Sequence, residues 1–244
     1  MKAMIFAAGL GMRLKPITDT KPKALVSFQG ITLLEYAIRK LKFYGVRHIV
    51  INVHHFAEQI IDFVKQHNFG VSISISDESQ KLLNTGGGLL NAQDFLNDSK
   101  PFFVYNVDII STINLHDLYA WHIKNNALAT LAVKDRKTSR YLLFDEHMQL
   151  SAWENRATKA TIITRNCTSY IPRAFSGIQI IDPKIFPLIQ EDGAFSITDL
   201  YLRLSENHCI VAYNHTNDFW LDVGKFDEIS DVETQLATHK LEFL

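Results

Sequence analysis

The first half of the sequence alternates short apolar runs with segments of helical periodicity. Residues 4–8, 48–53 and 102–105 are apolar runs of strand length. Between them, the apolar residues of 33–41 and 60–64 recur at helical spacing. Strands that alternate with helices in this way form sheets covered by helices, so the pattern predicts an α/β fold with a mostly parallel, mixed sheet. Ligands of such sheets bind beyond the carboxyl ends of the strands.

The pattern changes near residue 134. Residues 134–174 hold only short apolar runs among polar residues, which predicts an insertion of short strands or irregular loops. Strand and helix patterns return from residue 176, and a last helix is expected from Lys225 to about Lys240. Because no linker, internal repeat or low-complexity tract interrupts the chain, we predict a single domain over residues 1–244.

Composition excludes several classes of partner. The 244 residues carry a net charge of −1, which provides no overall field for nucleic acid or for an anionic membrane. No apolar run approaches the 18 residues of a membrane span, and the first apolar run is too short for a signal peptide. The two cysteines, Cys167 and Cys209, make neither a disulfide framework nor a CxxC site. We therefore expect a cytoplasmic protein, and the sequence makes no prediction of oligomeric state.

A glycine loop with two cations follows the first predicted strand. Gly9 and Gly11 end the apolar run, Arg13 follows at once, and Lys23 comes ten residues later. Glycines let backbone N–H groups approach a phosphate, and Arg and Lys neutralise its charge. A dinucleotide fingerprint would need a third glycine where Leu14 stands, and the Gly-Lys-Ser/Thr of a P-loop is absent. The segment predicts a polyphosphate site of another kind, with an ordinary tight turn as the alternative.

This segment resembles the signature of the sugar-1-phosphate nucleotidyltransferases. Their pattern, roughly AGGxGxRLxPLTxxxPKP, is matched by residues 7–18 and 21–24, with Ala8 and Ala24 as departures that remove no charge. The resemblance implies a Rossmann-like, glycosyltransferase-A-like fold that binds an NTP, a sugar 1-phosphate and Mg²⁺. The nucleotide-binding residues that it implies in this segment are Ala7, Ala8, Gly9, Gly11, Arg13 and Lys23. Arg13 and Lys23 are implied to be catalytic as well.

Two aspartates fall on metal-binding motifs of the same family. Asp108 ends the segment 106–108, where the family has Asn-Gly-Asp, and Asp222 lies in the segment 220–224, which resembles W-x-D-V-G. Either aspartate could otherwise cap a turn or a helix. Mg²⁺ typically takes one or two carboxylates and completes its shell with phosphate oxygens and water. The resemblance therefore implies Asp108 and Asp222 as metal ligands, and Asp108 as a catalytic residue.

A second glycine cluster occupies residues 83–88, after a predicted strand at 71–76 and before an apolar helix. Such a loop could pack closely against a flat base or ribose, with a flexible turn as the alternative. It resembles the L-E-T-G-G-G of muramic acid-1-phosphate uridylyltransferases, with Asn84 in place of the glutamate. The resemblance implies nucleotide contacts from Thr85, Gly86 and Gly87. Glu78 could accept a hydrogen bond from a base imide, or simply be solvated.

The sugar side has weaker motifs. Phe175 to Ile178 resembles the F-x-G-I strand of the family, and Glu154 fits the glutamate of its E-K-P motif. Asn155 replaces the lysine that would help to hold the sugar phosphate, and Arg156 or Lys159 could compensate. The sugar-binding residues that the resemblance implies are Asn106, Glu154 and Gly177. The resemblance also implies a division of the chain into a mainly nucleotide-binding part, a mainly sugar-binding part and a C-terminal helix, at 1–133, 134–224 and 225–244.

The implied reaction joins an NTP and a sugar 1-phosphate to give an NDP-sugar and pyrophosphate, and we expect UTP with an amino-sugar 1-phosphate. A phosphate monoester has a second pKa near ~6, so the nucleophile is ionised without a general base. The alternatives are a mannose-1-phosphate guanylyltransferase, a phosphocholine cytidylyltransferase, or a catalytically silent nucleotide-sugar sensor. The sensor is favoured by the departures at Asn84, Val107 and Asn155, and opposed by the intact Arg13, Lys23, Asp108 and Asp222.

Overall fold

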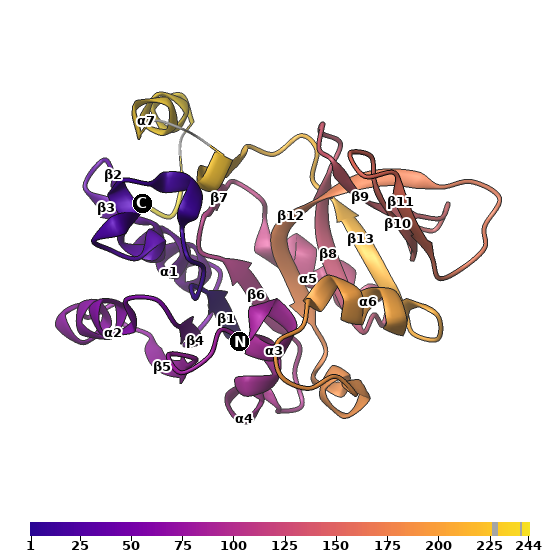
Figure 1. Cartoon of the computed structure of the whole chain (residues 1–244), viewed down its shortest axis with the longest axis horizontal. Coiled ribbons are helices and arrows are strands. Elements are labelled where there is room, and N and C mark those ends of the chain that lie inside the picture. The colour runs from indigo at the N-terminus through magenta and orange to yellow at the C-terminus, as the bar shows by residue number, and fades with distance from the viewer. Residues whose placement is uncertain (226–228, 240) are drawn as a thin grey trace.

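In the computed structural model of the protein, four parallel strands form one half of the central sheet (Figure 1). The structure describes residues 1–225, 229–239 and 241–244. In spatial order the parallel strands are β5 (Ser72–Asp77), β4 (His48–Val53), β1 (Lys2–Phe6) and β6 (Phe102–Asn106). Met4 of β1 lies opposite Val50 of β4 and Val104 of β6. The predicted parallel strands are confirmed, and β1 begins and ends two residues earlier than expected.

An antiparallel strand joins this half to the rest of the sheet. It is β12 (Ile171–Ile181), which pairs antiparallel with β6 and with β8 (Ala129–Lys134). β8 in turn pairs in parallel with β13 (Ile210–Asn214). Since β12 runs antiparallel to both β6 and β8, the carboxyl ends of β1, β6, β8 and β13 all lie at the same edge of the sheet. The sheet is mixed, as the α/β pattern predicted.

The region predicted as an insertion forms an antiparallel extension of the sheet. Its strands are β9 (Arg140–Phe144), β10 (Leu150–Asn155) and β11 (Ala160–Ile163). β9 pairs with the first residues of β12, and β10 and β11 follow outward in sequence order. Every residue of β11 is exposed, which is consistent with its place at the end of the strand order.

Helices cover both faces of the sheet. The α-helices are α1 (Leu33–Phe43), α2 (Ala57–Gln66), α3 (Asn84–Asn91), α4 (Gln93–Leu96), α5 (Leu115–Lys124), α6 (Ile197–Ser205) and α7 (Ile229–Ala237). Short 3₁₀ helices lie at Met12–Leu14, Ile17–Asp19, Lys23–Leu25, Pro183–Leu188 and Val223–Lys225. α1 begins where the Thr32 side chain accepts a hydrogen bond from the Glu35 N–H at 3.1 Å, a typical N-cap. The last predicted helix is described only from Ile229, because residues 226–228 and 240 lie outside the described part of the chain.

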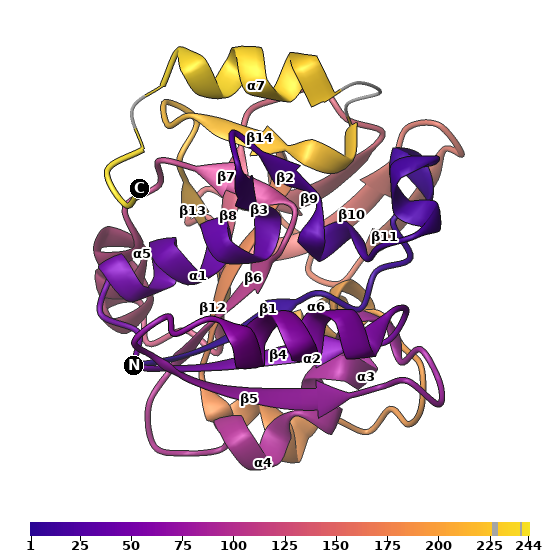
Figure 2. The same cartoon turned by 90° about the vertical axis from the view of Figure 1, so that its left-hand side faces the viewer.

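The alternation of side chains along the strands divides the core in two. Ala3 and Ile5 of β1 pack into one cluster with apolar residues of α1, α2 and α5. Met4 and Phe6 point to the other face and pack with residues of α3, α4 and α6. Figure 2 shows α1 and α3 on opposite sides of β1. The sheet is thus covered by apolar side chains on both faces.

A two-stranded ribbon stands beside the main sheet. β7 (Ile109–Ser111) pairs antiparallel with β14 (Trp220–Asp222), so that Asp222 lies opposite Ile109. A second small hairpin, β2 (Ser27–Phe28) with β3 (Ile31–Thr32), lies beside α7. The β7–β14 ribbon matters for function, because it brings a segment near the C-terminus back to the end of β6.

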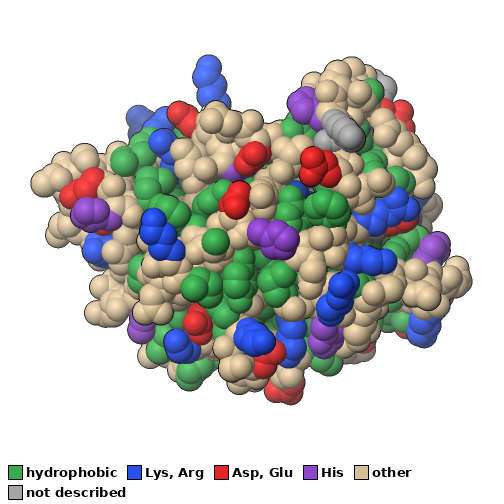
Figure 3. Space-filling view, turned by 180° about the vertical axis from the view of Figure 1, so that it is seen from behind, with side chains coloured by type: hydrophobic (Ala, Val, Ile, Leu, Met, Phe, Trp, Pro, Cys, Tyr) green, Lys and Arg blue, Asp and Glu red, His purple; other side chains and the backbone are tan. Residues whose placement is uncertain are grey.

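The surface carries both signs of charge. On the face seen from behind, Lys and Arg side chains are interspersed with Asp and Glu side chains (Figure 3). Among the described helices, none combines the length and the apolar character that crossing a membrane would need.

Candidate active site

A cavity of about 590 Å³ opens beyond the carboxyl ends of β1 and β6. Its wall is built from the glycine loop after β1, the ends of β4 and β6, the start of α3 and the residue before α6. The lining residues are Phe6 to Met12, Leu14, Lys23, Asn52, Leu82, Asn84, Thr85, Asn106, Val107, Asp108 and Ser196. This is the edge at which parallel sheets of this kind bind ligands.

Lys23 and Asp108 form an ion pair at the cavity. The Lys23 ammonium donates to Oδ2 of Asp108, and the two side chains are only 11% and 20% exposed. Lys23 begins a 3₁₀ helix after Pro22, whereas Asp108 lies in the turn between β6 and β7. The structure therefore brings together a predicted cation and a predicted metal carboxylate that are distant in sequence.

The two glycines of the first loop serve different purposes. Gly11 has a φ of +65°, and a Cβ there would lie 2.9 Å from Thr18 Cγ2 and 3.2 Å from Lys23 Cβ. A Cβ on Gly9 would meet no atom of the described residues within 4 Å, and Gly9 lines the cavity. Gly11 is thus required by the chain itself, while Gly9 leaves open space for a ligand. The side chain of Arg13 lies outside the described part of the structure.

Asn52 is a site residue that sequence reasoning missed. It is the penultimate residue of β4, is 2% exposed and lines the cavity. Its Oδ1 accepts the Ala7 N–H at 2.7 Å, and its Nδ2 donates to Oε1 of Glu78 at 2.7 Å. Asn52 therefore fixes the start of the glycine loop, and the Ala7 N–H is already used within the chain. A polar residue at the carboxyl end of a buried strand was the signal available in the sequence.

Glu78 has a different place from the one predicted. It is 3% exposed and is not among the cavity-lining residues. Besides Asn52, it accepts the Leu83 N–H at 3.1 Å through Oε2, so both carboxylate oxygens are engaged by the chain. Burial raises the pKa of Glu78. The Glu78 carboxylate thus lies inside the protein, where it holds Asn52 and the Leu83 N–H, whereas a contact with a base was predicted.

The second glycine cluster packs against the protein itself. The helix α3 begins at Asn84, so the glycines lie inside the helix, not before it. A Cβ on Gly86 would overlap the Phe195 ring, and one on Gly87 would overlap the Gly193 carbonyl oxygen. The predicted close packing is present, but its partner is the segment 193–195. Within this cluster the residues that line the cavity are Asn84 and Thr85.

The β7–β14 ribbon places Asp222 beside Asp108. The Val223 N–H donates to the Asp108 carbonyl oxygen at 3.0 Å, and Oδ1 of Asp222 accepts the Gly224 N–H at 3.1 Å. Within the described residues no cluster of three or more His, Cys, Asp or Glu side chains is arranged to hold a metal. Two carboxylates on adjoining segments are nevertheless a fitting donor set for Mg²⁺, because phosphate oxygens and water supply the remaining ligands.

Two of the three predicted sugar-side residues lie together. Gly177 has a φ of +75°, and a Cβ there would lie 2.9 Å from Nδ2 of Asn106, which lines the cavity. Glu154 lies on β10, beyond β9 and β12 in the sheet, and pairs with Nε of Arg156 at 2.7 Å. Glu154 is not among the cavity-lining residues. The structure therefore groups Asn106 with Gly177 and leaves Glu154 apart.

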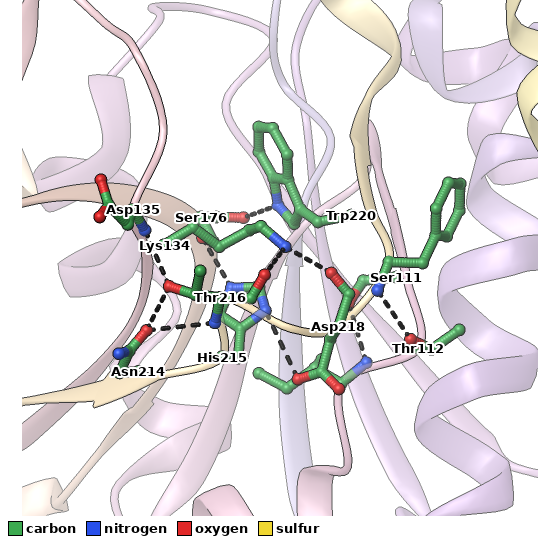
Figure 4. A network of polar contacts seen from close by, with 12 residues as sticks. Ser111, Thr112, Lys134, Asp135, Ser176, Asn214, His215, Thr216, Asp218 and Trp220 are labelled. Atoms are coloured by element: carbon green, nitrogen blue, oxygen red, sulfur yellow. Dashed lines mark hydrogen bonds and ion pairs between the residues drawn. The ribbon is translucent and has the colours of Figure 1, made fainter.

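A polar network holds the loop that leads into β14 (Figure 4). The Lys134 ammonium donates to the carbonyl oxygens of Thr216, at 2.8 Å, and Asp218. Nε2 of His215 is 2.7 Å from the Ser176 hydroxyl, and Nε1 of Trp220 donates to the Ser176 carbonyl oxygen at 2.8 Å. These bonds tie the segment before Asp222 to β8 and β12. The position of Asp222 thus depends on strands that lie beyond β6.

His215 is held neutral inside this network. Burial, together with the positive charges of Lys134, Lys40 and Arg136, lowers the pKa of His215 to about 3. Its Nδ1 lies 3.7 Å from Oδ2 of Asp218, beyond hydrogen-bond distance. The ring therefore packs and positions Ser176 without carrying a charge at neutral pH.

Comparisons with known proteins agree with this geometry. The family model described as nucleotidyl transferase matches residues 2–239. A mannose-1-phosphate guanyltransferase of Yarrowia lipolytica is 31% identical over 229 residues, which cover 92% of this chain and 61% of the relative. The catalytic subunit beta of a mannose-1-phosphate guanylyltransferase from Dictyostelium discoideum is 30% identical over 234 residues, with the same two coverages. The chain thus spans about three fifths of the length of the curated relatives it matches.

The fold has close counterparts among solved structures. The crystal structure of HddC from Yersinia pseudotuberculosis matches with a TM-score of 0.74 and 20% identity, over 96% of this chain and 99% of HddC. At this level of identity the likeness shows the fold alone. It confirms the expected fold, a mixed sheet with helices on both faces.

Proposed function

Because the chain belongs to the nucleotidyl transferase family, we propose that it transfers a nucleotidyl group from an NTP to a sugar 1-phosphate. The observation that carries this proposal is the cavity beyond β1 and β6, where the glycine loop, Lys23 and Asp108 meet. Open space at Gly9 and a cation at the rim suit a polyphosphate. Residues 1–133 would bind mainly the nucleotide, and residues 134–224 mainly the sugar.

In the proposed reaction, an oxygen of the sugar phosphate attacks the α-phosphorus of the NTP. A new oxygen–phosphorus bond forms, the bond to the β-phosphate oxygen breaks, and pyrophosphate leaves with its electron pair. The attacking phosphate is already ionised near neutral pH, so no side chain needs to remove a proton. The protein's task is to position two anions and to neutralise their charge.

Different residues would position the two substrates and neutralise their charge. Lys23 would place its ammonium between the α-phosphate and the sugar phosphate, exchanging Asp108 for phosphate oxygens when the substrates bind. Arg13 would neutralise the departing phosphates. Asp108 and Asp222 would hold Mg²⁺, whose charge would stabilise both reacting phosphates. Asn106 and Gly177, which lie side by side, would contact the sugar.

For the base and the sugar we propose UTP with an amino-sugar 1-phosphate, on the strength of the Leu83 to Gly88 motif. A second candidate pair is GTP with mannose 1-phosphate. It is supported by the names of the relatives from Yarrowia lipolytica and Dictyostelium discoideum. Asn84, the departure within the motif, lines the cavity, so its side chain is placed to influence the choice between them.

A substrate panel tests the proposal. Purified protein with MgCl₂ is offered each of five NTPs together with mannose 1-phosphate, glucose 1-phosphate, N-acetylglucosamine 1-phosphate, N-acetylmuramate 1-phosphate or phosphocholine. Pyrophosphate release is the readout. We expect turnover with a sugar 1-phosphate, most rapid with UTP and an amino sugar. Release with phosphocholine alone would favour the cytidylyltransferase alternative, and binding without release across the panel would favour the sensor.

A further inference from the structure

Arg136 is not among the residues that line the cavity, but it contacts residues close to Gly177 on the proposed sugar side and to Asp222 on the proposed metal side. It follows β8 at the edge of the sheet that carries the cavity. Its guanidinium stacks on the Trp220 ring, with Cζ 4.5 Å from the ring centroid, and Nη2 donates to the Phe175 carbonyl oxygen at 2.9 Å. Trp220 is two residues before Asp222, and Phe175 is two residues before Gly177. Arg136 is thus fixed between the strands that present these two residues.

The guanidinium has bonding capacity that the protein does not use. Nε of Arg136 is buried and has no hydrogen-bond partner among the described residues. Burial lowers the pKa of Arg136, and the negative charge of Asp222 opposes this change. Asp222 is one of the two carboxylates assigned to the metal.

Three other described cations, Lys134, Arg156 and Lys23, are already paired within the protein. The Lys134 ammonium donates to two carbonyl oxygens of the loop before β14. Arg156 pairs with Glu154 and stacks on the Tyr141 ring at 4.2 Å. Lys23 pairs with Asp108 at the nucleotide side.

Residue 155 is also engaged by the chain. Oδ1 of Asn155 accepts the N–H groups of Ala157, at 3.1 Å, and Thr158, at 3.4 Å, so it stabilises a turn. Lys159 belongs to the same turn, with a φ of +60°, and is exposed. The sequence suggested that Arg156 or Lys159 could replace the lysine that is missing at position 155. Both residues are less well placed than Arg136 to hold the sugar phosphate.

We propose that Arg136 binds the phosphate of the sugar 1-phosphate, with Trp220 and the Phe175 carbonyl orienting its planar fork. This inference rests on the proposed function. Arg is suited to the task because its fork can donate two parallel hydrogen bonds to a phosphate, which an ammonium cannot do. Arg136 would thereby hold the nucleophile, while Lys23 faces the α-phosphate.

The test compares Arg136→Met and Arg136→Lys with a matched control, Lys137→Met. Lys137 is the next residue of the same loop and is exposed, so its loss removes the same charge without touching Trp220 or Phe175. Isothermal titration calorimetry with MgCl₂ measures the binding of mannose 1-phosphate, N-acetylglucosamine 1-phosphate, UTP and GTP. The melting temperature of each variant shows whether it is folded.

We expect Arg136→Met to weaken sugar-phosphate binding about 10- to 100-fold, the loss typical of a hydrogen bond to a charged group. NTP affinity should stay at the wild-type value, Arg136→Lys should be intermediate, and Lys137→Met should match wild type. Should Arg136→Met prove unstable, the folded Arg136→Lys variant provides the comparison.

Unchanged sugar-phosphate affinity in Arg136→Met would overturn the inference. So would an equal loss of NTP affinity, an equal effect of Lys137→Met, or wild-type protein that binds NTP but neither sugar phosphate. Because binding is measured without turnover, the result is separate from the substrate panel. Arg136-dependent binding with no pyrophosphate release would support the inference and contradict the proposed transferase.

Discussion

Lys23 and Asp108 come from segments 85 positions apart, and their contact sets the local charge of the cavity. The chain as a whole is nearly neutral, so attraction for an anionic substrate has to come from such single side chains. Lys23 and Asp108 share one ion pair in the structure, yet in the proposed reaction they face different partners. At the residue scale, the proposed function requires the Lys23 ammonium to exchange the Asp108 carboxylate for a phosphate.

Lys23→Ala is expected to reduce kcat by about 100-fold or more, because it removes a cation aimed at the reacting phosphates. The melting temperature should also fall, since the two side chains are only 11% and 20% exposed and the loss of Lys23 leaves a largely buried carboxylate unpaired. Steady-state kinetics and thermal unfolding check both values. Lys15→Ala, which removes an exposed cation from the same loop, serves as the control. Wild-type kcat in Lys23→Ala would rule out its catalytic assignment.

At the scale of elements, two kinds of close packing position the cavity wall. α3 approaches the segment 193–195 so closely that only glycine fits at positions 86 and 87. The ribbon of β7 and β14 depends instead on hydrogen bonds from β8 and β12 to the loop before β14. The glycine loop after β1 differs from both, because Gly9 faces open space.

Gly87→Ala and Gly9→Ala should therefore have opposite effects. In Gly87→Ala the new methyl group would overlap the Gly193 carbonyl oxygen, and we expect a loss of about 1–3 kcal/mol in the free energy of unfolding. In Gly9→Ala the fold should keep its stability, while NTP affinity falls because the methyl group enters the cavity. Urea unfolding and NTP titration separate the two outcomes. Equal stability losses in both variants would contradict this assignment.

The neutral His215 predicts a dependence of stability on pH. Its pKa is about 3 in the folded protein and 6.5 when unperturbed, so between these values the unfolded chain binds the extra proton. Stability should fall as the pH drops below 6.5, by up to about 1.4 kcal/mol per pH unit. Lys134, Lys40 and Arg136 disfavour the proton, and Asp218 faces Nδ1.

Urea unfolding at pH 7.5, 6 and 5 measures this effect. His215→Gln should lose less stability on acidification than wild type, because it removes the group that must stay neutral. His67→Gln, on an exposed ring, should follow wild type. Parallel pH profiles for wild type and His215→Gln would show that His215 does not provide the acid sensitivity.

At the scale of the whole molecule, the cavity lies at the edge shared by two cores. One cluster packs under α1, α2 and α5, and the other under α3, α4 and α6. Lys23 belongs to the side of the first cluster, whereas Thr85 belongs to α3 on the second. A ligand in the cavity would contact elements from both faces of the sheet, and its binding energy should stabilise the molecule as a unit.

Saturation with the correct NTP and MgCl₂ should therefore raise the melting temperature. At a concentration of 100 Kd the stabilisation is about 2.7 kcal/mol, which corresponds to roughly 5–10 °C for a chain of this size. Thermal unfolding with each NTP measures it, and Asp108→Asn should show a smaller shift. A shift of the same size with every NTP would indicate that the cavity does not select the base.

Local sequence determined the elements that depend on local physics. The parallel strands, most helices and the glycine loop with Lys23 were predictable, because periodicity and backbone freedom are properties of neighbouring residues. The mixed α/β fold followed from the alternation of strand and helix patterns, and the family from the glycine-loop motif; both are confirmed by the comparisons and the structure.

Only the tertiary structure decided which distant groups meet. It placed Glu78 behind the loop on Asn52, turned Gly86 and Gly87 toward the segment 193–195, and left Glu154 outside the cavity lining. It also brought Arg136 onto Trp220. Such partners come from segments far apart in the chain, and a motif states which residue types are present without stating what they face. The family was therefore predictable from the sequence, whereas the separation of cavity-lining residues from residues that support them inside the protein required the fold.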